Sequence, residues 1–348
     1  MARSKAASEY VCQACAATFP RWEGQCRACG AWNALVETLI APAERRSRAR
    51  AGSRPAAAAP RPLGELEAAR VARRPTGIGE VDRLLGGGLV PGAVLLLGGE
   101  PGIGKSTLVL QVAGTLAAAA TAEPADAQVL YASAEESAAQ LHLRAARLGL
   151  TGGPADASLQ VLAGTDVAGI VTAAAAAPPA LLVVDSIQTV EVDGLDGPPG
   201  SVGQVREAAS QLGAFAREHG VPVLLVGHVT KDGALAGPRT QEHLVDAVLM
   251  LEGDRYGSLR LLRALKNRHG STEEVGVMEM TGAGLVEVQD TAAAFLGSGQ
   301  REAPGVAVAA VLEGTRPLLV EVQALVAPAS GLGPPRRTVA GLDGNRLA

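Results

Sequence analysis

The stretch GEPGIGKST, residues 99–107, matches the pattern GxxxxGK followed by Ser or Thr. It follows an apolar run, AVLLLGG (93–99), and opens a segment of helical character, Thr107–Ala120. Glycines let a backbone wrap around an anion, and successive N–H groups at a helix N-terminus attract phosphate. Because strand, loop and helix follow in the required order, we interpret the stretch as a nucleotide-binding loop rather than a glycine-rich turn with only a structural role.

The polar side chains of this loop have distinct expected tasks in binding ATP. Lys105 is expected to contact the β- and γ-phosphates, and the Ser106 hydroxyl is expected to bind Mg²⁺. The predicted nucleotide-binding residues are Gly99, Glu100, Pro101, Gly102, Ile103, Gly104, Lys105, Ser106 and Thr107.

Apolar runs around this loop predict a buried parallel sheet. Near-continuous apolar runs are typical of strands covered on both faces, and helical segments such as Val205–His219 lie between them. Three later runs, SLRLLRAL, GVMEM and GLVEV, are short and alternating, which predicts antiparallel strands at the edge of the sheet. The fold class is therefore α/β with a doubly wound sheet. The predicted parallel strands are AVLLLGG (93–99), QVLYASA (128–134), ALLVVDS (180–186), PVLLVGH (222–228) and AVLMLEG (247–253).

Two predicted strands end in acidic residues, as ATP hydrolysis requires. Asp185 ends the run LLVVD and is placed as the acid that holds Mg²⁺, usually through water. Glu135 and Glu136 follow another strand, and one carboxylate must orient the attacking water. We choose Glu135 because it follows the strand directly. Glu136 is expected to cap the next helix, although the sequence separates the two only weakly.

All four cysteines lie within the first 29 residues, as Cys12-x2-Cys15 and Cys26-x2-Cys29 separated by ten residues. Each pair can present two thiolates from one tight turn, and two such pairs complete a tetrahedral zinc site. A redox dithiol is the alternative, but a second pair at this spacing favours zinc. Four thiolates fill the coordination sphere, so the predicted site is structural.

Composition divides the chain into four predicted parts. Residues 40–74 carry nine arginines against three glutamates. This composition favours a solvated tether, with contact to phosphates as a second role. The expected parts are a zinc module (1–36), an Arg-, Ala- and Pro-rich linker (37–74), an ATPase core (75–297) and the start of a further domain (298–348).

Bulk properties exclude some classes of protein. The net charge of −4 gives no global sign of nucleic-acid binding, so DNA affinity must come from a local cluster. The beginning of the chain, MARSKAASEYVC, lacks the apolar region of a secretory signal. The uncharged stretch Val167–Val184 is cut by Pro178 and Pro179, which predicts a helix, a break and a buried strand. We therefore expect a soluble, cytoplasmic protein without membrane contact.

Together these motifs resemble those of the bacterial RadA (Sms) family, which are RecA-related DNA repair ATPases. The N-terminal segment CQACAATFPRWEGQCRACGAWN resembles the zinc finger of that family, including Trp22, Gly24 and Trp32. The resemblance implies a RecA-like core, a homo-hexameric ring, single-stranded or branched DNA as ligand and a RecA-type recombinase as partner. The other matching segments are TGIGEVDRLLGGGLVPGAVLLLGGEPGIGKSTLVLQ, YASAEES, DSIQT, PGSVGQVRE, GHVTKDGALAGPR and LKNRHG, in the family's order.

The resemblance also implies which residues act on ATP and DNA. Lys105, Glu135 and Asp185 match the family's nucleotide-binding lysine, catalytic glutamate and magnesium-binding acid. Residues 193–207 and 230–239 resemble the two DNA-facing loops, and neither contains an aromatic residue, so base stacking there should be minor. The predicted DNA-binding residues are Arg206, Lys231 and Arg239. His228 matches a residue that can sense the γ-phosphate, and a structural histidine at a strand end is an equal alternative.

The family signature Lys-Asn-Arg-Phe-Gly reads Lys266, Asn267, Arg268, His269 and Gly270 in this chain. It resembles the paired cations with which ring-shaped RecA-like motors reach the ATP of a neighbouring subunit. Lys266 and Arg268 are therefore predicted to be catalytic across a subunit interface, with a large effect on rate. His269 replaces the phenylalanine, which is expected either to weaken apolar packing of the motif or to add a phosphate donor.

Residues 304–348 resemble the start of a Lon-protease-like α/β domain, expected to be incomplete, and PGVAVAAVLEGTRPLLVEVQALV predicts two strands around a turn. Lon proteases use a Ser–Lys pair, but no lysine follows Lys266, so we expect no protease activity. The expected function is a DNA-dependent ATPase of recombinational repair that translocates on single-stranded DNA and branch-migrates intermediates. The alternative is an ATP-dependent switch, similar to KaiC, that binds a protein partner without motor activity.

Overall fold

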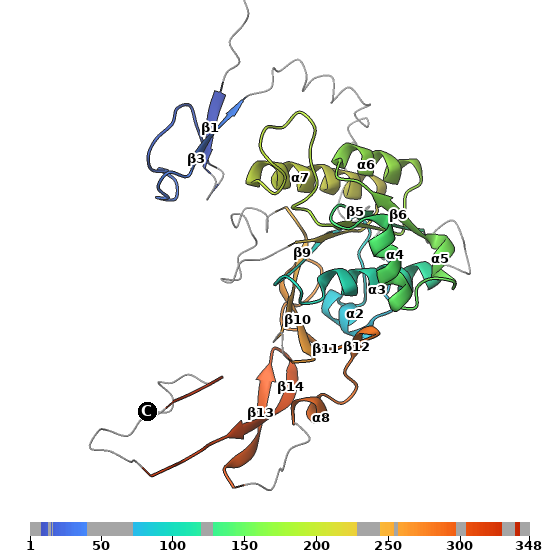
Figure 1. Ribbon diagram of the computed structural model, residues 1–348, viewed down its shortest axis with the longest axis vertical. Helices are drawn as coiled ribbons and strands as arrows, with labels where there is room; N and C mark the ends of the chain where they lie inside the picture. The colour runs from blue at the N-terminus through green and yellow to red at the C-terminus, as the bar shows by residue number, and fades with distance from the viewer. Residues whose placement is uncertain are drawn as a thin grey trace, which may run out of the picture. The chain divides into compact units, whose positions relative to one another are not determined.

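The computed structural model describes residues 8–12, 15, 17–39, 72–119, 128–227, 244–253, 257–296, 304–328 and 338–341 (Figure 1). Contacts divide the chain into two compact units. The first comprises Met1–Gln289 with Glu313–Arg316, and the second comprises Asp290–Leu312 with Pro317–Ala348.

A nine-stranded sheet forms the centre of the first unit, in the order β12-β11-β10-β9-β4-β8-β7-β5-β6. Strands from β9 to β6 run parallel, whereas β10, β11 and β12 are antiparallel to their neighbours. The doubly wound sheet with antiparallel edge strands is therefore confirmed. The strands are β4 (Val94–Gly99), β5 (Val129–Ser133), β6 (Leu159–Ala163), β7 (Leu181–Asp185), β8 (Val223–Val226), β9 (Ala247–Glu252), β10 (Leu259–Asn267), β11 (Val275–Thr281) and β12 (Gly284–Glu287).

Helices cover both faces of this sheet. Alternation along β4 sends Leu95 and Leu97 into one apolar cluster and Val94 and Leu96 into the other. The first cluster includes residues of α2, α3, α4 and α5, and the second includes residues of α6 and α7 (Figure 1). The helices are α2 (Gly79–Leu85), α3 (Lys105–Ala119), α4 (Ala138–Arg147), α5 (Ala155–Ser158), α6 (Val167–Ala176) and α7 (Val202–His219).

The differences from the sequence prediction lie mainly at element ends and at the sheet edge. α3 and α7 begin two and three residues earlier than predicted. Strand β6 was not predicted, because it is a partly exposed edge strand whose apolar content resembles the helical segments around it. The stretch Val167–Val184 divides into α6, a break and β7, as expected. Among the described residues, no helix is long and apolar enough to cross a membrane.

The N-terminal module contains a small antiparallel sheet in the order β2-β1-β3. Its strands are β1 (Ser8–Cys12), β2 (Thr18–Phe19) and β3 (Leu35–Leu39). Cys12, Cys26 and Leu35 form the centre of its apolar cluster. So small a core cannot stabilise a fold alone, which makes a bound metal important for this module.

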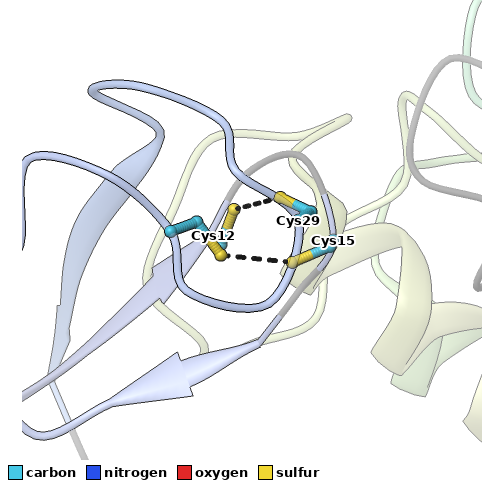
Figure 2. A group of neighbouring side chains, drawn as sticks. Cys12, Cys15 and Cys29 are labelled. Atoms are coloured by element: carbon cyan, nitrogen blue, oxygen red, sulfur yellow. Dashed lines mark hydrogen bonds between the residues drawn. The ribbon is translucent and has the colours of Figure 1, made fainter.

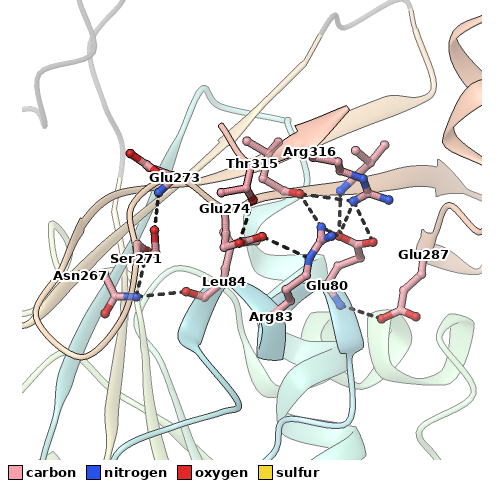
Figure 3. A network of polar contacts seen from close by, with 12 residues as sticks. Glu80, Arg83, Leu84, Asn267, Ser271, Glu273, Glu274, Glu287, Thr315 and Arg316 are labelled. Atoms are coloured by element: carbon pink, nitrogen blue, oxygen red, sulfur yellow. Dashed lines mark hydrogen bonds and ion pairs between the residues drawn. The ribbon is translucent and has the colours of Figure 1, made fainter. Parts of the chain in front are cut away.

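The C-terminal residues form α8 (Thr291–Phe295) and the two-stranded sheet of β13 (Val306–Glu313) and β14 (Arg316–Gln323). Two strands around a turn are therefore confirmed. The turn Glu313–Arg316 belongs to the first unit, where Arg316 Nη1 lies 3.0 Å from both carboxylate oxygens of Glu80 on α2 (Figure 3). Arg83 pairs with the same carboxylate, so one partly buried acid holds two arginines.

Candidate active site

The predicted nucleotide-binding loop lies between the end of β4 and the start of α3. Gly104 has φ +115°, and a Cβ atom there would lie 2.4 Å from Met280 Cε. Gly102 has φ +79°, and a Cβ atom there would meet no other atom within 4 Å. The loop is therefore tightly packed where it faces the protein and open at its tip, which leaves backbone N–H groups available to an anion.

Lys105 is buried inside this loop. Its Nζ donates to the carbonyl oxygens of Gly99 at 2.9 Å and Glu100 at 3.0 Å. Burial lowers the pKa of Lys105, while the nearby carboxylates of Asp185 and Glu135 raise it. The three predicted catalytic groups at this end of the sheet therefore lie within one electrostatic environment.

Asp185 ends β7 and is buried. Tyr131 on β5 donates its hydroxyl to Asp185 Oδ2 at 2.6 Å. Burial raises the pKa of Asp185, although the bonds from Tyr131 and Ser106 lower it in part. Among the described residues, Asp185 Oδ1 is buried without a hydrogen-bond partner. The Asp185 carboxylate, with one oxygen unpartnered, and the Ser106 hydroxyl are hard oxygen donors of the kind that Mg²⁺ prefers, so these residues fit that ion.

The side chains of the adjacent glutamates Glu135 and Glu136 have different partners. Glu135 accepts a hydrogen bond from Ser186, the residue directly after Asp185. Glu136 instead pairs with Arg144 on α4. The expectation that Glu136 caps this helix was wrong, because Ser137 is the N-cap and forms a capping box with Gln140. Of the two carboxylates, Glu135 is thus the one beside the other catalytic candidates.

Two supporting residues were missed by sequence reasoning. Arg260 on β10 is buried, and its Nε donates to the Ile103 carbonyl of the loop at 3.1 Å. Its other guanidinium nitrogen Nη1 bonds to Gly257 and Leu259 carbonyls. Tyr131 is fully buried against Asp185. The available signal was weak: one of two arginines inside the apolar run SLRLLRAL, and a polar ring in a buried strand.

The motif Lys266–Gly270 lies where the parallel strands of the same sheet begin. The nucleotide-binding loop and Asp185 lie where these strands end. β9 runs parallel to β4 with Ala247 opposite Leu95, and Asn267 of β10 is opposite Ala247. The motif therefore lies beside the start of β4, whereas the nucleotide-binding loop follows its end. Six residues of strand separate the two, a distance of about 20 Å.

Backbone contacts hold this motif in place. Lys266 Nζ donates to the Val245 carbonyl at 2.7 Å, and Arg268 Nη1 lies 2.9 Å from Asp246 Oδ1. Asp246 also accepts from the backbone N–H of Val94 at 2.9 Å. The Arg268 side chain is still 55% exposed. It is therefore anchored at one nitrogen and accessible to an external anion.

His269 is exposed, and its described hydrogen bonds use only backbone atoms. Its N–H donates to Asn267 Oδ1 at 3.0 Å, and its carbonyl accepts from Arg73. It also lines a mainly apolar pocket with Leu85, Val90 and Leu95 among others. A phenylalanine ring is compatible with such surroundings.

Only part of the predicted DNA-binding set falls within the described residues. Arg206 is exposed on α7. Within the first predicted loop, the buried Gln204 accepts from Val192 N–H at 2.8 Å and donates to the Leu195 carbonyl at 2.8 Å. Gln204 was another missed residue, and it fixes the backbone of this loop. Lys231, Arg239 and His228 lie outside the described residues.

The four cysteines converge in the N-terminal module. Figure 2 labels Cys12, Cys15 and Cys29 of this group. Their sulfur atoms all lie within 4.8 Å of one another, with Cys12 and Cys29 at 3.7 Å and Cys15 and Cys26 at 3.5 Å. Four thiolates 2.3 Å from a central zinc ion are about 3.8 Å apart, whereas a disulfide requires about 2 Å. The arrangement is that of a four-cysteine zinc ribbon.

The electrostatics of one cysteine favour metal binding. Burial alone would raise the pKa of Cys26, but backbone N–H groups of Cys29 and Ala28, with neighbouring thiols, lower it to about 7. A thiolate is the form that binds metal, so the local backbone prepares this ligand.

Comparison with known proteins gives consistent matches. The AAA domain family matches residues 59–234, and the rubredoxin metal binding domain matches residues 10–37. DNA repair protein RadA of Pseudomonas aeruginosa is 50% identical over 345 residues, which cover 99% of this chain and 73% of that protein. DNA repair protein RadA of Bacillus subtilis is 46% identical over 350 residues, which cover 100% of this chain and 73% of that protein. A solved KaiC-like protein from Pyrococcus horikoshii OT3 is 22% identical, covers 63% of this chain and 99% of its own, and has a TM-score of 0.49.

Proposed function

The chain belongs to the RadA family of DNA repair ATPases, and from this premise we propose that it binds single-stranded DNA and couples ATP hydrolysis to movement along it. The proposed assembly is a homo-hexameric ring with the DNA strand in its channel. The proposed work is branch migration of recombination intermediates, alongside a RecA-type recombinase. The proposed parts are a zinc module (1–36), a linker (37–74), the ATPase core (75–297) and the start of a Lon-like domain (298–348).

The proposed chemistry is in-line attack of water on the γ-phosphate of ATP. Glu135 orients the water, and Lys105 leaves its loop carbonyls to neutralise charge on the β- and γ-phosphates. Ser106 and Asp185 hold Mg²⁺, which when bound neutralises further phosphate charge. Tyr131 keeps Asp185 in place through its hydroxyl.

The observation that carries this proposal is the division of cations between two edges of one sheet. Lys105 lies at the carboxyl edge, and Lys266 and Arg268 lie at the amino edge. A flexible side chain cannot bridge about 20 Å, so any action of Lys266 and Arg268 on ATP must be on the ATP of another copy. The exposure of Arg268 supports such a role, because a neighbouring phosphate can reach it.

The test is ATP turnover as a function of single-stranded DNA concentration, with native mass measured in the same buffer. Turnover that rises with DNA, and a mass of six chains, are the expected results. Lys105→Ala should abolish the DNA-stimulated part, and Arg147→Ala, an exposed arginine on α4, should not. Turnover that is independent of DNA would instead support the switch that binds a protein partner without motor activity.

A further inference from the structure

The only two tryptophans of the chain, Trp22 and Trp32, are both exposed on the zinc ribbon. Their exposed fractions are 54% and 72%. The ribbon builds its apolar cluster from Cys12, Cys26 and Leu35 instead. A tryptophan is the largest apolar side chain that so small a core can use, and two left outside it mark a surface for contact.

The backbone brings both rings to one place. A Cβ atom on Gly24 would lie 3.9 Å from Trp22 Cη2 and 3.9 Å from Trp32 Cζ3. Asn33 N–H donates to the Gly24 carbonyl at 2.8 Å, and Gln25 pairs with Trp32 across the same hairpin. This hairpin also carries Cys26 and Cys29, so zinc binding fixes the positions of the rings. The two exposed rings thus flank Gly24, a residue that has no side chain.

Two exposed arginines lie in the same segment of the chain as the tryptophans. Arg21 and Arg27 contact the two carboxylate oxygens of Glu23 through Nε, at 3.9 and 2.7 Å. Their side chains are 79% and 70% exposed. Two guanidinium groups share one carboxylate, so Arg21, Glu23 and Arg27 together carry a net charge of +1. Guanidinium groups in the same segment as aromatic rings complement a strand of phosphates and bases.

We propose that Trp22 and Trp32 are a stacking platform for unpaired bases of single-stranded DNA, with Arg21 and Arg27 contacting the flanking phosphates. The platform rests on the proposed function, because it requires that the chain engages single-stranded DNA. Stacking tolerates any sequence, since every base has a π-face. The two DNA-facing loops predicted in the core contain no aromatic residue, so the ribbon supplies a contact that those loops lack.

Tryptophan fluorescence can measure stacking on this platform directly, because Trp22 and Trp32 are the two tryptophans of the sequence. The zinc-loaded chain is titrated with end-labelled oligothymidylate and with an abasic strand of equal length and charge. Label polarisation measures total binding, and tryptophan emission measures stacking. We expect oligothymidylate to quench the emission strongly and the abasic strand to quench it much less at equal saturation.

Variants locate the effect. Trp22→Ala and Trp32→Ala should each weaken oligothymidylate binding about fivefold or more, and Trp32→Phe should restore most of the loss because it keeps a ring. Val36→Ala is the matched control, since Val36 is a half-exposed apolar residue of the same module. Its binding should match the unmodified chain. Zinc content near one ion per chain verifies that each variant ribbon is folded.

The outcomes separate the platform from the proposed function. Polarisation that reports bound DNA with unchanged tryptophan emission would overturn the platform and assign the rings to a protein partner. Alanine variants that bind DNA as tightly as the unmodified chain would also overturn it. A failure to bind DNA by either measurement would contradict the proposed function, and the platform with it.

Discussion

Charged residues lie at both ends of the parallel strands, but their burial differs. The carboxyl edge is where these strands end, and the amino edge is where they begin. At the carboxyl edge, Lys105 and Asp185 are buried, and burial lowers the pKa of the lysine and raises that of the acid. At the amino edge, Arg268 is half exposed and pairs with Asp246. An exposed ion pair stabilises a protein by less than about 1 kcal/mol. Arg268 can therefore exchange Asp246 for a phosphate at small cost.

Under the proposed function, this difference is that of an active site divided between copies of one chain. Burial at the carboxyl edge keeps charged groups in place but destabilises them until a ligand arrives. Exposure at the amino edge keeps a cation available to a neighbour. Each of the following predictions tests one side of this comparison.

The largest effect is expected at the amino edge. Arg268→Ala should lower DNA-stimulated turnover on the order of 10³-fold or more, because the cation acts on a developing phosphate charge. The Arg268→Ala chain keeps its own nucleotide site, and a Lys105→Ala chain keeps its own arginine. Mixing the two inactive chains should restore a measurable part of the rate. An inactive mixture that still forms mixed rings by native mass would contradict action between subunits.

The next effect separates the two glutamates of the carboxyl edge. Glu135→Gln should lower turnover about 10²- to 10⁴-fold while leaving ATP affinity nearly unchanged, because only the orientation of the attacking water is lost. Glu136→Gln is the matched control, since its ion pair with Arg144 is structural. Single-turnover kinetics distinguish the two. A larger loss for Glu136→Gln would reverse the assignment.

A smaller effect concerns stability. Burial raises the pKa of Asp185 in the folded state, so its ionised form destabilises the folded chain at pH values above that pKa. This cost disappears as the pH falls through the folded pKa, because the carboxyl group is then protonated. Asp185→Asn should therefore raise the free energy of unfolding near pH 8, by about 1.4 kcal/mol per unit of pKa shift, and the gain should shrink toward pH 4.

The measurement for this variant is thermal unfolding in EDTA across that pH range, with the unmodified chain at every pH. Adding Mg²⁺ and ATP should stabilise the unmodified chain more than Asp185→Asn. A variant that is less stable at pH 8 than at pH 4, relative to the unmodified chain, would contradict the destabilising role of the buried charge.

The smallest effect is expected at His269. His269→Phe should leave turnover unchanged or slightly higher, within about twofold, because the exposed ring lines an apolar pocket and the described hydrogen bonds of this residue use its backbone. Turnover and its pH profile between 6 and 8 provide the measurement. A large loss of rate would give the imidazole a role of its own.

Local patterns were sufficient for much of the fold. The five parallel strands and the three antiparallel edge strands follow from continuous and alternating apolar runs. Strand β6 was not predicted, because this edge strand has no pattern of buried residues that distinguishes it from a helix. The helix starts were missed by two or three residues, since terminal residues carry little periodicity.

For the candidate site too, some residues could be predicted from local patterns and others could not. Spacing alone predicted the phosphate-binding loop and the zinc ligands, and the strand ends predicted Asp185. Arg260, Tyr131 and Gln204 were not predicted. Their importance comes from burial and from partners up to 157 residues away, which no local pattern contains.

By itself, the sequence determined which chemical groups are present and predicted their roles: a nucleotide loop, two pairs of thiolates, strand-end acids and a cation motif, each encoded within a few adjacent residues. The tertiary structure alone decided how these groups meet. It separated Glu135 from Glu136, placed Lys266 and Arg268 at the sheet edge opposite Lys105, and left Trp22 and Trp32 exposed. The physical reason is that residue type sets what a side chain can bind, whereas strand order and burial set what it can reach.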